Sequence, residues 1–562
     1  MSGTAYETYF DGTPTNGANP WIDSLVGGGA WRDSPGLSSS GGPVTISYTL
    51  QSGWDPYGLV PGYARSWNFE ESIAAAGSFS AWEAVANVDF VSASSSQADV
   101  WIWSLYNSQI GDGYLGISEM PGYSSGEPLF TAFNNEVTSW VGSGLGRGGY
   151  AFTTLLHELG HLLGLAHPHD GGYDWEGTNF PGVTAAFDDY GDYDLNQGIF
   201  TIMSYNDGWA ARYPSHTAID YGWTATPMAL DIAAIQMIYG ANTTYASGNN
   251  TYTLPTANVA GTFWSCIWDT GGVDIISNAG SSTGSIINLN AAPLTGPNAG
   301  GHVSYVNNII GGFTIANGVV IENATGGFAN DTLVGNGAHN LLIGNAGVDS
   351  LSGEAGNDTL DGGGGADILV GGEGADRFLI DTASEQVIEA AGGGADTIIA
   401  SVSYTMPANI EVLMLGDGVV GQSLTGGSAN DVLMGNANAN NLLGGAGNDT
   451  LDGGGGVDTL SGGQGADRFL IDTASDQVIE TSGGGADTII SSVSYTVPAH
   501  VEALMLAAGV SGLSLTGSSG SDILIGNGLA NNFFGGAGDD VIMGQDMSVA
   551  TILALFSTWP PL

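Results

Sequence analysis

Three histidines and one glutamate stand close together in the segment HELGHLLGLAH, which runs from His157 to His167. On a helix, His157 and His161 lie four residues apart on one face, so both imidazoles can reach one metal ion. Gly164 allows the chain to leave the helix with a positive φ and to bring His167 back as a third ligand. Three protein ligands leave a position open for water, as in catalytic zinc sites, and Glu158 can accept a proton from that water. These residues predict a zinc-dependent protease.

A methionine lies downstream of the third histidine. The segment TIMSY, from Thr201 to Tyr205, places Met203 where the extended zinc-protease motif expects a methionine turn beneath the metal. A bare H-E-x-x-H pattern also occurs as two histidines that bind no metal. Because Gly164, His167 and Met203 all follow at the required places, we predict one catalytic Zn²⁺.

The residues up to 245 alternate helices and strands, which indicates an α/β domain. The helix that must carry the histidines is predicted over 151–163, where apolar side chains recur on one face. A further helix is predicted to begin with Thr226 as N-cap and Pro227 as its first residue, and to end at Gly240. The strand 113–118 could be the sheet edge on which an extended peptide substrate lies, or a plain edge. The other predicted elements are strands over 43–50 and 98–105 and a helix over 67–88.

The composition is strongly acidic. The 562 residues include 56 Asp and Glu against 6 basic residues, all of them arginine, for a formal net charge of −50. This charge repels phosphate backbones and anionic lipid surfaces, so we expect no nucleic-acid partner. No run of about 18 or more apolar residues occurs, which argues against membrane insertion. Carboxylates in such number either solvate the surface or hold cations, and their positions decide between the two.

After residue 325 the sequence becomes periodic and rich in glycine. Nine-residue units follow one another from 326 to 379, and further arrays of the same unit begin at Gly426 and at Gly517. In each unit the glycines permit a tight turn, the sixth residue offers a carboxylate, and an apolar eighth residue faces inward from a short strand. Stacked turns of this kind predict an all-β solenoid, a parallel β-roll that holds several Ca²⁺ ions. A disordered glycine-rich linker would not need so regular a spacing.

The acids at the sixth position of each unit are the predicted calcium ligands of the roll. In three units an asparagine, Asn340, Asn440 or Asn531, takes this place, one unit before an acidic turn. A neutral amide there could cap a stack of turns or leave a weaker half-site, so the number of bound ions stays open. Sites with dissociation constants of about 10⁻⁴ to 10⁻³ M suit an extracellular module and would stay empty in a cytosol. The acids are Asp331, Asp349, Asp358, Asp367, Asp376, Asp431, Asp449, Asp458, Asp467, Asp522 and Asp540.

A second, longer repeat separates the arrays. The segment that begins at Ile380 closely matches the segment that begins at Ile471, 91 residues later. These two segments could be β-rich spacers or additional binding modules. The single cysteine, Cys266, excludes an intramolecular disulfide, which fits either a cytosolic protein or an exported one stabilised by metals.

The zinc motif and the repeats together resemble one known family. HELGHLLGLAHP with the downstream MSY is similar to the serralysins, bacterial metzincin proteases of the M10 family that join a zinc-protease domain to a calcium-binding RTX β-roll. Pro168, directly after the third histidine, distinguishes serralysins from matrixins, astacins and adamalysins. The resemblance extends through 227–242 and 267–274 and covers most of residues 20 to 380. It implies a zinc metalloendopeptidase that hydrolyses extracellular proteins, with Glu158 assisting the attack of zinc-bound water.

The resemblance also implies further ligands. Tyr205 would be an additional zinc ligand that swings away to stabilise the oxyanion of the tetrahedral intermediate. The implied cofactors are therefore one catalytic Zn²⁺ and several structural Ca²⁺. A calcium site at the domain junction would be formed by Gly248, Asn250, Asp269, Gly271 and Asp274.

Export and partners follow from the resemblance as well. The N-terminus, MSGTAYETYF, has neither the basic nor the apolar region of a cleaved secretory signal. Serralysins use type I secretion machinery and an uncleaved C-terminal signal. The apolar tail 547–562 would be that signal, although it ends in WPPL where the family usually has an acidic residue and a few hydrophobics. We therefore expect a secreted, monomeric bacterial protein whose partners are protein or peptide substrates.

The sequence leaves a second function open. An alternative function is a calcium-dependent surface or adhesion protein whose metalloprotease-like domain is inert. Glu158 argues against this alternative, because a binding protein needs no base beside its metal.

The predicted organisation divides the chain into consecutive segments. These are a propeptide-like N-terminal tail (1–20), the catalytic domain (21–245), a β-rich junction (246–325), RTX arrays (326–379, 426–470 and 517–546), β spacers (380–425 and 471–516) and the C-terminal signal (547–562).

Overall fold

The structure is a computed structural model that describes residues 6–9, 19–27, 29–32, 42–55, 61–121, 128–170 and 179–544. The chain forms two compact units, Met1–Asn323 and Ala324–Leu562. The predicted junction 246–325 therefore lies almost wholly in the first unit, and the finer predicted boundaries stay predictions. The predicted export signal, 547–562, lies outside the described residues, as does most of the predicted N-terminal tail.

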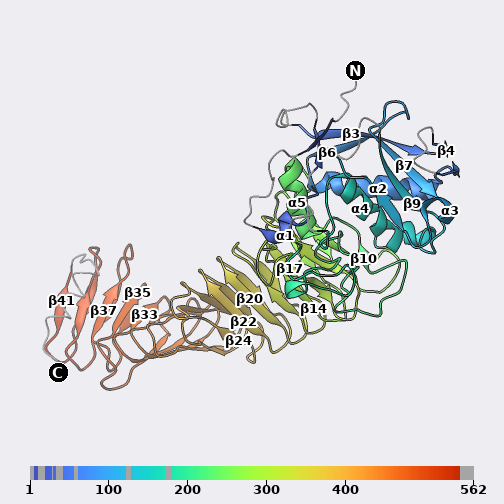
Figure 1. The fold of residues 1–562 in the computed structure, drawn as a ribbon. Coiled ribbons are helices and arrows are strands. Elements are labelled where there is room, and N and C mark those ends of the chain that lie inside the picture. The colour runs from blue at the N-terminus through green and yellow to red at the C-terminus, as the bar shows by residue number, and fades with distance from the viewer. Residues whose placement is uncertain are drawn as a thin grey trace. The chain divides into compact units, whose positions relative to one another are not determined.

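Five strands form the central sheet of the first unit. Their order is β6 (Val88–Ser92), β3 (Val44–Gln51), β7 (Val100–Leu105), β9 (Leu129–Asn134) and β8 (Gly116–Ser118). The first four, which are labelled in Figure 1, are parallel. β8 runs antiparallel to β9 along one edge. The predicted strands are thus confirmed as β3, β7 and β8, and β8 is an edge strand as predicted.

Three helices complete the α/β part of this unit: α2 (Phe69–Val85), α4 (Tyr150–Leu162) and α5 (Ala229–Tyr239). The indole N–H of Trp82 on α2 donates to the Leu156 carbonyl of α4 at 3.2 Å, in a fully buried contact. The apolar side chains of α4 are buried as their spacing predicts. The described part also contains two short helices, α1 (Pro20–Asp23) and α3 (Asn107–Ile110).

The predicted start of the last helix is wrong by two residues. α5 begins at Ala229 and not at Pro227, because the carboxylate of Asp231 accepts the N–H of Met228 at 2.9 Å and thereby caps the helix there. Its predicted end at Gly240 is confirmed by a positive φ of 82°.

Shorter strands fill the rest of the first unit. One group forms a sheet in the order β10 (Trp223–Thr224), β12 (Phe263–Ile267), β16 (Gly312–Ile315), β15 (Ser304–Val306) and β14 (Ser285–Asn288). The remaining pairs are β1 (Tyr6–Tyr9) with β2 (Gly29–Arg32), β4 (Gly53–Trp54) with β5 (Tyr63–Ala64), and β11 (Thr251–Thr253) with β13 (Ile275–Ser277). Among the described residues, no helix combines the length and apolar character that a membrane crossing needs.

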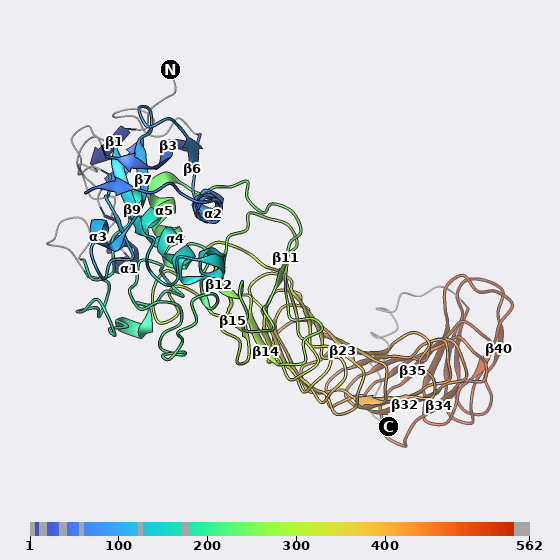
Figure 2. The same cartoon turned by 90° about the vertical axis from the view of Figure 1, so that its right-hand side faces the viewer.

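One face of the second unit is a single continuous parallel sheet. Each of its strands pairs with the next but one along the chain, so the strands stack along a roll (Figure 2). β17 (Asn323–Thr325) lies at the division between the units. The other strands of this face are β19 (Leu341–Ile343), β21 (Thr359–Asp361), β23 (Arg377–Ile380), β25 (Thr397–Ala400), β27 (Val412–Leu415), β29 (Val432–Met434), β31 (Thr450–Asp452), β33 (Arg468–Ile471), β35 (Thr488–Ser491), β37 (Ala503–Leu506), β39 (Ile523–Ile525) and β41 (Val541–Met543).

The opposite face is divided into separate groups of parallel strands. The first group is β18 (Thr332–Val334), β20 (Ser350–Ala355), β22 (Ile368–Glu373) and β24 (Gln386–Ile388). The second is β26 (Tyr404–Thr405), β28 (Ser423–Thr425), β30 (Asn441–Ala446), β32 (Thr459–Gln464) and β34 (Gln477–Ile479). The third is β36 (Tyr495–Thr496), β38 (Ser514–Thr516) and β40 (Asn532–Phe534). The breaks fall in the two spacers.

The core of the roll is a column of apolar side chains from the eighth position of the units, except in the last two, where Phe533 is partly buried and Ile542 is exposed because the described stack ends there. Leu333, Leu342, Leu351, Leu360 and Leu369 are completely buried. The spacers add Ile398 and Leu413, and in the second copy Ile489 and Leu504, to the same column. The fold is therefore an α/β region followed by a parallel β-roll, as the sequence predicts.

Candidate metal centre

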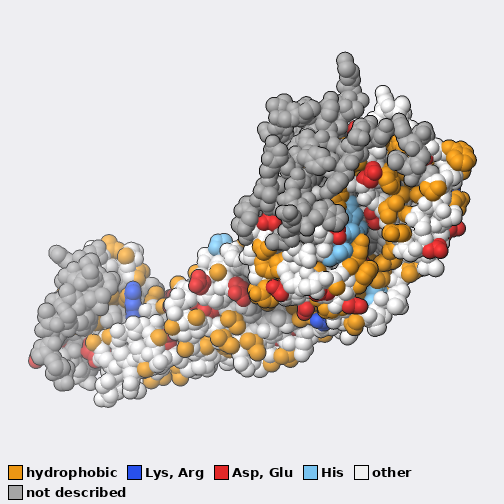
Figure 3. Space-filling view, viewed as in Figure 1, with side chains coloured by type: hydrophobic (Ala, Val, Ile, Leu, Met, Phe, Trp, Pro, Cys, Tyr) orange, Lys and Arg blue, Asp and Glu red, His pale blue; other side chains and the backbone are white. Residues whose placement is uncertain are grey.

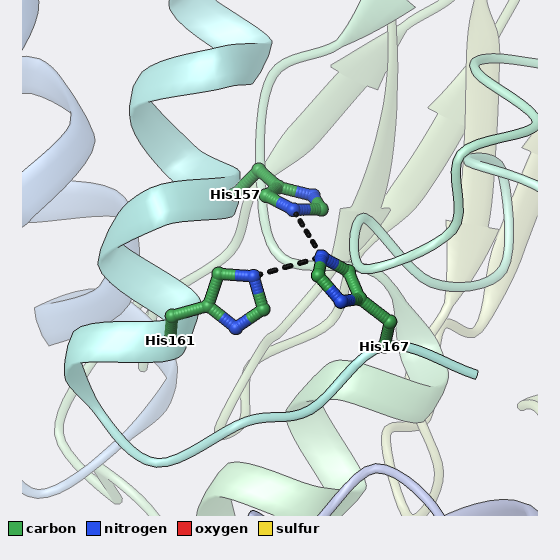
Figure 4. Close-up of side chains that lie close together, drawn as sticks. All are labelled: His157, His161 and His167. Atoms are coloured by element: carbon green, nitrogen blue, oxygen red, sulfur yellow. Dashed lines mark hydrogen bonds between the residues drawn. The ribbon is translucent and has the colours of Figure 1, made fainter. Parts of the chain in front are cut away.

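Helix α4 presents His157 and His161 one turn apart, toward His167 (Figure 4). Nε2 of His167 lies 3.1 Å from Nε2 of His157 and 2.9 Å from Nε2 of His161. Histidine side chains are visible on the surface of this unit among hydrophobic and acidic ones (Figure 3). The three predicted ligands meet at one point, where His161 is buried and His157 and His167 are partly buried.

The other ring nitrogens of the two helix histidines are held by backbone carbonyls. Nδ1 of His157 donates to the carbonyl of Ile202 at 2.7 Å, and Nδ1 of His161 donates to that of Leu165 at 2.8 Å. Burial, followed by the neighbouring imidazoles, lowers the pKa of His157 to about 3 and that of His161 well below its usual value. The rings are therefore neutral, with their Nε2 lone pairs directed at the meeting point.

This donor set fits a zinc ion. Lone pairs that converge on one point repel one another unless a cation lies between them. In a tetrahedral site with Zn–N bonds of about 2.0–2.1 Å, ligand nitrogens lie about 3.3 Å apart. The observed separations of 2.9 and 3.1 Å approach that value. Three imidazoles and an open side are the arrangement typical of catalytic zinc.

The turn after α4 brings the third histidine back. Gly164 has a φ of 99°, which favours glycine, and its carbonyl accepts the N–H of Gly27 at 2.7 Å. The segment that follows α1 therefore supports the turn from outside. Nδ1 of His167 pairs with the carboxylate of Asp170 at 2.5 Å, which orients the ring. Sequence reasoning missed Asp170, although its position three residues after a predicted ligand is a usable signal.

Met203 lies beneath the helix and is fully buried. A Cβ on Gly160 would lie 2.6 Å from its Sδ atom, so the bare glycine admits the methionine against α4. Asp231 holds this turn, because its carboxylate accepts the Thr201 hydroxyl at 2.6 Å and the Ile202 N–H at 2.8 Å. Asp231 thus positions the first histidine through the backbone. Sequence reasoning missed Asp231, and the usable signal was a single acid in a mostly apolar helix.

Glu158 is buried beside the edge strand β8. A Cβ on Gly116 of that strand would lie 2.8 Å from Oε1 of Glu158, so the carboxylate lies directly against the strand. Its Oε2 atom is buried and has no hydrogen-bond partner among the described residues. Burial raises the pKa of Glu158 to about 8, and a nearby cation would lower it. An unpartnered carboxylate in this place can serve as a base toward a water or a substrate in the adjoining pocket.

A pocket of about 290 Å³ opens beside His157 and Glu158. The ring of Tyr205 forms part of its wall, with its centroid 4.5 Å from that of His167 and 5.1 Å from that of Phe187. Burial raises the pKa of Tyr205 to about 12, so its hydroxyl is protonated at neutral pH. Its ligand role stays a prediction. The pocket is lined by Gly113, Tyr114, Leu115, Gly116, Tyr150, Thr153, Thr154, His157, Glu158, Phe187, Ser204, Tyr205 and Asp207.

The predicted calcium residues of the first unit also meet. The N–H of Asn250 donates to Oδ1 of Asp274 at 2.7 Å, and the N–H of Gly271 donates to Oδ1 of Asp269 at 2.9 Å. A Cβ on Gly272 would collide with the carbonyl oxygen of Gly248, so that oxygen lies at the same loop. Oδ1 of Asn250 and Oδ2 of Asp274 are buried without a partner in the described structure. Oxygen donors of this kind fit Ca²⁺.

The acids of the roll form ladders. The N–H of Asp349 donates to Oδ1 of Asp367 at 2.7 Å, and the N–H of Asp358 donates to Oδ1 of Asp376 at 2.8 Å, each across 18 residues. Burial raises the pKa of Asp358 to about 7. An oxygen with no hydrogen-bond donor, buried in a turn, fits a hard cation. In the described residues Oδ2 is buried and unpartnered in Asp349, Asp358, Asp367, Asp376, Asp449, Asp458 and Asp467.

The turns that open each array differ from the interior ones. Oδ2 of Asp331 accepts the N–H of Gly327 at 2.6 Å, and the same bond occurs at Asp431 and at Asp522. Oδ1 of Asp540 accepts the N–H of Asp522 at 3.1 Å. Where asparagine replaces the acid, as in Asn440, its Oδ1 accepts the N–H four residues earlier. The ion count of the roll therefore stays a prediction.

Sequence reasoning missed the acids of the spacers. On the continuous face, the N–H of Asp376 donates to Oδ1 of Asp396, and the N–H of Asp396 donates to Glu411, both at 2.8 Å. The same bonds recur at Asp467, Asp487 and Glu502. The usable signal was the GGGAD at 392–396, which repeats the GGGAD at 363–367 outside the nine-residue spacing.

Comparison with known proteins gives one family match in the second unit. The model of the RTX calcium-binding nonapeptide repeat matches residues 325–360, 343–378, 423–442, 434–469 and 516–546. The predicted repeats are therefore confirmed, and both spacers fall largely outside the matched residues.

The chain is also similar to proteins named as metalloproteases and serralysins. The chain is 32% identical over 328 residues to the Metalloprotease AprA of Pseudomonas entomophila, which is 55% of this chain and 62% of that protein. It is 30% identical over 266 residues to the Serralysin of Proteus mirabilis (44% and 48%) and 36% identical over 197 residues to the Serralysin C of Dickeya chrysanthemi (33% and 36%). The matches thus span about a third to three fifths of these relatives. The chain is similar to serralysin-type metalloproteases and carries RTX repeats.

Proposed function

We propose that this protein is a secreted zinc-dependent endopeptidase with a calcium-stabilised roll. The observation that carries the proposal is the convergence of three imidazoles beside the carboxylate of Glu158, whose buried Oε2 has no partner among the described residues, at a pocket that borders an edge strand. The similarity to proteins named as metalloproteases and serralysins supports it.

Zn²⁺ held by His157, His161 and His167 would polarise the scissile carbonyl and lower the pKa of water. An extended peptide can add to β8, whose free edge borders the pocket, and would then lie across Glu158. Glu158 would accept a proton from the attacking water and return it to the leaving amine. The protonated hydroxyl of Tyr205 would donate to the developing oxyanion.

The roll suits a protein that works outside the cell. Its unpartnered carboxylates repel one another without cations, and weak calcium sites fill only where calcium is abundant. We propose export through type I secretion machinery, action on protein or peptide substrates, and a monomeric state. The same carboxylates would keep the roll loose before export.

Casein hydrolysis tests the proposed activity. The zinc-loaded chain should cleave casein, and a zinc chelator or Glu158→Ala should abolish cleavage. Glu70→Ala, which removes an exposed acid from α2, is the matched control and should stay active. Circular dichroism should report the same fold for all three proteins. Elemental analysis should find about one zinc and several calcium ions per chain.

The opposite result would favour another function. A folded chain that holds zinc and calcium yet cleaves no peptide would contradict the protease proposal. It would support the alternative of a calcium-dependent surface or adhesion protein.

A further inference from the structure

The first spacer contains a buried carboxylate cluster that no nonapeptide predicts. Glu389 and Asp396 belong to the spacer, and Asp376 is the last acid of the first array. All three side chains are more than nine-tenths buried, at 8%, 0% and 1% exposure respectively. Glu389 and Asp396 lie outside the residues that the RTX repeat model matches.

The three carboxylates share one small space. A Cβ on Gly371 would collide with both Oε1 of Glu389 and Oδ2 of Asp376, so these oxygens lie over the same bare Cα atom. Oδ1 of Asp396 accepts the N–H of Asp376 at 2.8 Å. The charges of Asp396 and of Asp376 add to burial in raising the pKa of Glu389.

Each carboxylate keeps an oxygen that the protein does not satisfy. Oδ2 of Asp376, Oε2 of Glu389 and Oδ2 of Asp396 are buried without a hydrogen-bond partner among the described residues. In the described part of the second unit no arginine forms an ion pair with these acids. Three buried carboxylates that keep unpartnered oxygens destabilise the fold unless a cation joins them.

A backbone oxygen completes the arrangement. A Cβ on Gly393 would lie 2.7 Å from the carbonyl oxygen of Gly372 and 2.8 Å from Oε2 of Glu389, so these two oxygens flank the same glycine. The donors are therefore all oxygen, three of them carboxylates. Such a set selects a hard cation such as Ca²⁺, with water filling the remaining positions.

The second spacer repeats the cluster. Oδ1 of Asp487 accepts the N–H of Asp467 at 2.8 Å, and Oε1 of Glu480 accepts the N–H of Gly462 at 2.7 Å. Oδ2 of Asp467 and Oδ2 of Asp487 are again buried and unpartnered in the described structure. Oε2 of Glu480 differs, because it accepts the N–H of Thr481 at 3.2 Å. A Cβ on Gly462 would collide with Oδ2 of Asp467 and with Oε1 of Glu480, as one on Gly371 would with the matching oxygens of the first spacer, so the two clusters share this placement of their carboxylates.

We propose that each spacer binds one Ca²⁺ ion, the first through Asp376, Glu389 and Asp396 and the second through Asp467, Glu480 and Asp487. The spacers are then irregular calcium turns that keep the ladder of the continuous face intact. This inference rests on the proposed calcium-binding role of the roll and not on the proposed protease activity.

Calcium counting on the full-length chain tests the proposal. All proteins carry Glu158→Ala so that self-cleavage cannot intervene, and bound calcium is measured by elemental analysis after dialysis at a calcium concentration that saturates the parent. Glu389→Gln and Glu480→Gln should each lose one ion per chain, and the double variant should lose two. The control Glu70→Gln/Asp417→Asn removes the same charge from exposed positions and should lose none.

Unchanged calcium counts in the three spacer variants would overturn the inference while leaving the calcium-binding roll in place. A parent chain that binds no calcium would overturn the role of the roll itself. If a variant loses its β-sheet circular dichroism, recovery at about tenfold higher calcium with one ion fewer supports the site. A failure of calcium to restore the fold argues against it, because the glutamate would then act in packing alone.

Discussion

The backbone carbonyl of Ile202 accepts a hydrogen bond of 2.7 Å from Nδ1 of His157, so the methionine turn directly orients a predicted metal ligand. The turn is fixed in its own right by Asp231, which accepts the N–H of the same residue at 2.8 Å. The metal centre is therefore linked to α5 through two successive hydrogen bonds. Groups that hydrogen-bond the second ring nitrogen of a metal-binding histidine affect the affinity for the metal as well as the orientation of the ring.

Asp231→Asn should weaken zinc binding. The change leaves the turn with a poorer acceptor, and we expect the zinc affinity to fall about 10- to 100-fold. Competition with a chelator of known zinc affinity measures the zinc affinity of each protein. Thr201→Val removes the hydroxyl bond to Asp231 and the acceptor of the Met203 N–H, but it leaves the bond from the Ile202 N–H to Asp231 in place and should have a smaller effect. Equal zinc affinities in Asp231→Asn and the parent would show that the link has no influence on the metal.

Gly116→Ala should lower the turnover number without removing zinc. The new Cβ would lie 2.6 Å from Cγ and 2.8 Å from Oε1 of Glu158, so the carboxylate must move. We expect kcat to fall about 100-fold, as for an active-site displacement of about 1 Å. Gly42→Ala is the control, because its Cβ would meet nothing within 4 Å. The measurement is the rate of casein turnover by Gly116→Ala protein that holds its full zinc content. A rate equal to that of the parent would contradict the placement of Glu158 against β8.

The calcium-free roll should become more stable as the pH falls. Burial raises the pKa of Asp358 to about 7 and those of Asp349 and Asp449 to about 6 in the folded state, against about 3.9 in an unfolded chain. The folded state therefore holds protons that the unfolded chain releases, and its stability is lost as the pH rises from about 4 to about 7.

Urea unfolding followed by far-UV circular dichroism checks this expectation. After calcium is removed on a chelating resin, the midpoint at about pH 5 should exceed that at about pH 7.5. With saturating calcium the order should reverse, because protons then compete with the cation for the carboxylates. The same order of midpoints with and without calcium would contradict the role assigned to these acids.

Calcium addition to the chelated chain should increase the β-sheet signal in far-UV circular dichroism. The Oδ2 atoms of the ladder acids have no hydrogen-bond partner among the described residues, so the folded roll depends on cations to offset the repulsion between these carboxylates. Magnesium at the same concentration should act weakly, because it requires a stricter octahedral geometry. A spectrum that calcium leaves unchanged would show that the roll folds without it.

The zinc ligands and the core of the roll could be predicted because they depend on local sequence patterns. The meeting of His157 and His161 follows from helical spacing, and the return of His167 follows from the positive φ that Gly164 permits. The eighth-position leucines could be assigned to the core because the repeat fixes their register.

Features that depend on distant parts of the chain could not be predicted. Asp231 reaches the methionine turn across about 30 residues, and Gly116 meets Glu158 only because β8 is the edge strand next to α4. Asp396 escaped notice because it follows Asp376 by 20 residues instead of 18. The hydrogen bond is the same in both cases, because the two extra residues lie in the connection between β24 and β25, and β25 then pairs with β23 as the earlier strands do.

The unbroken sheet from β19 to β41 gives the second unit the character of a one-dimensional array. Each strand pairs only with its neighbours in the stack, so order spreads from turn to turn without the closure of long loops. Both spacers interrupt the opposite sheet but leave this one intact. Folding that nucleates at either end can therefore propagate through all three arrays. The end that first binds calcium would then set the direction in which the roll folds.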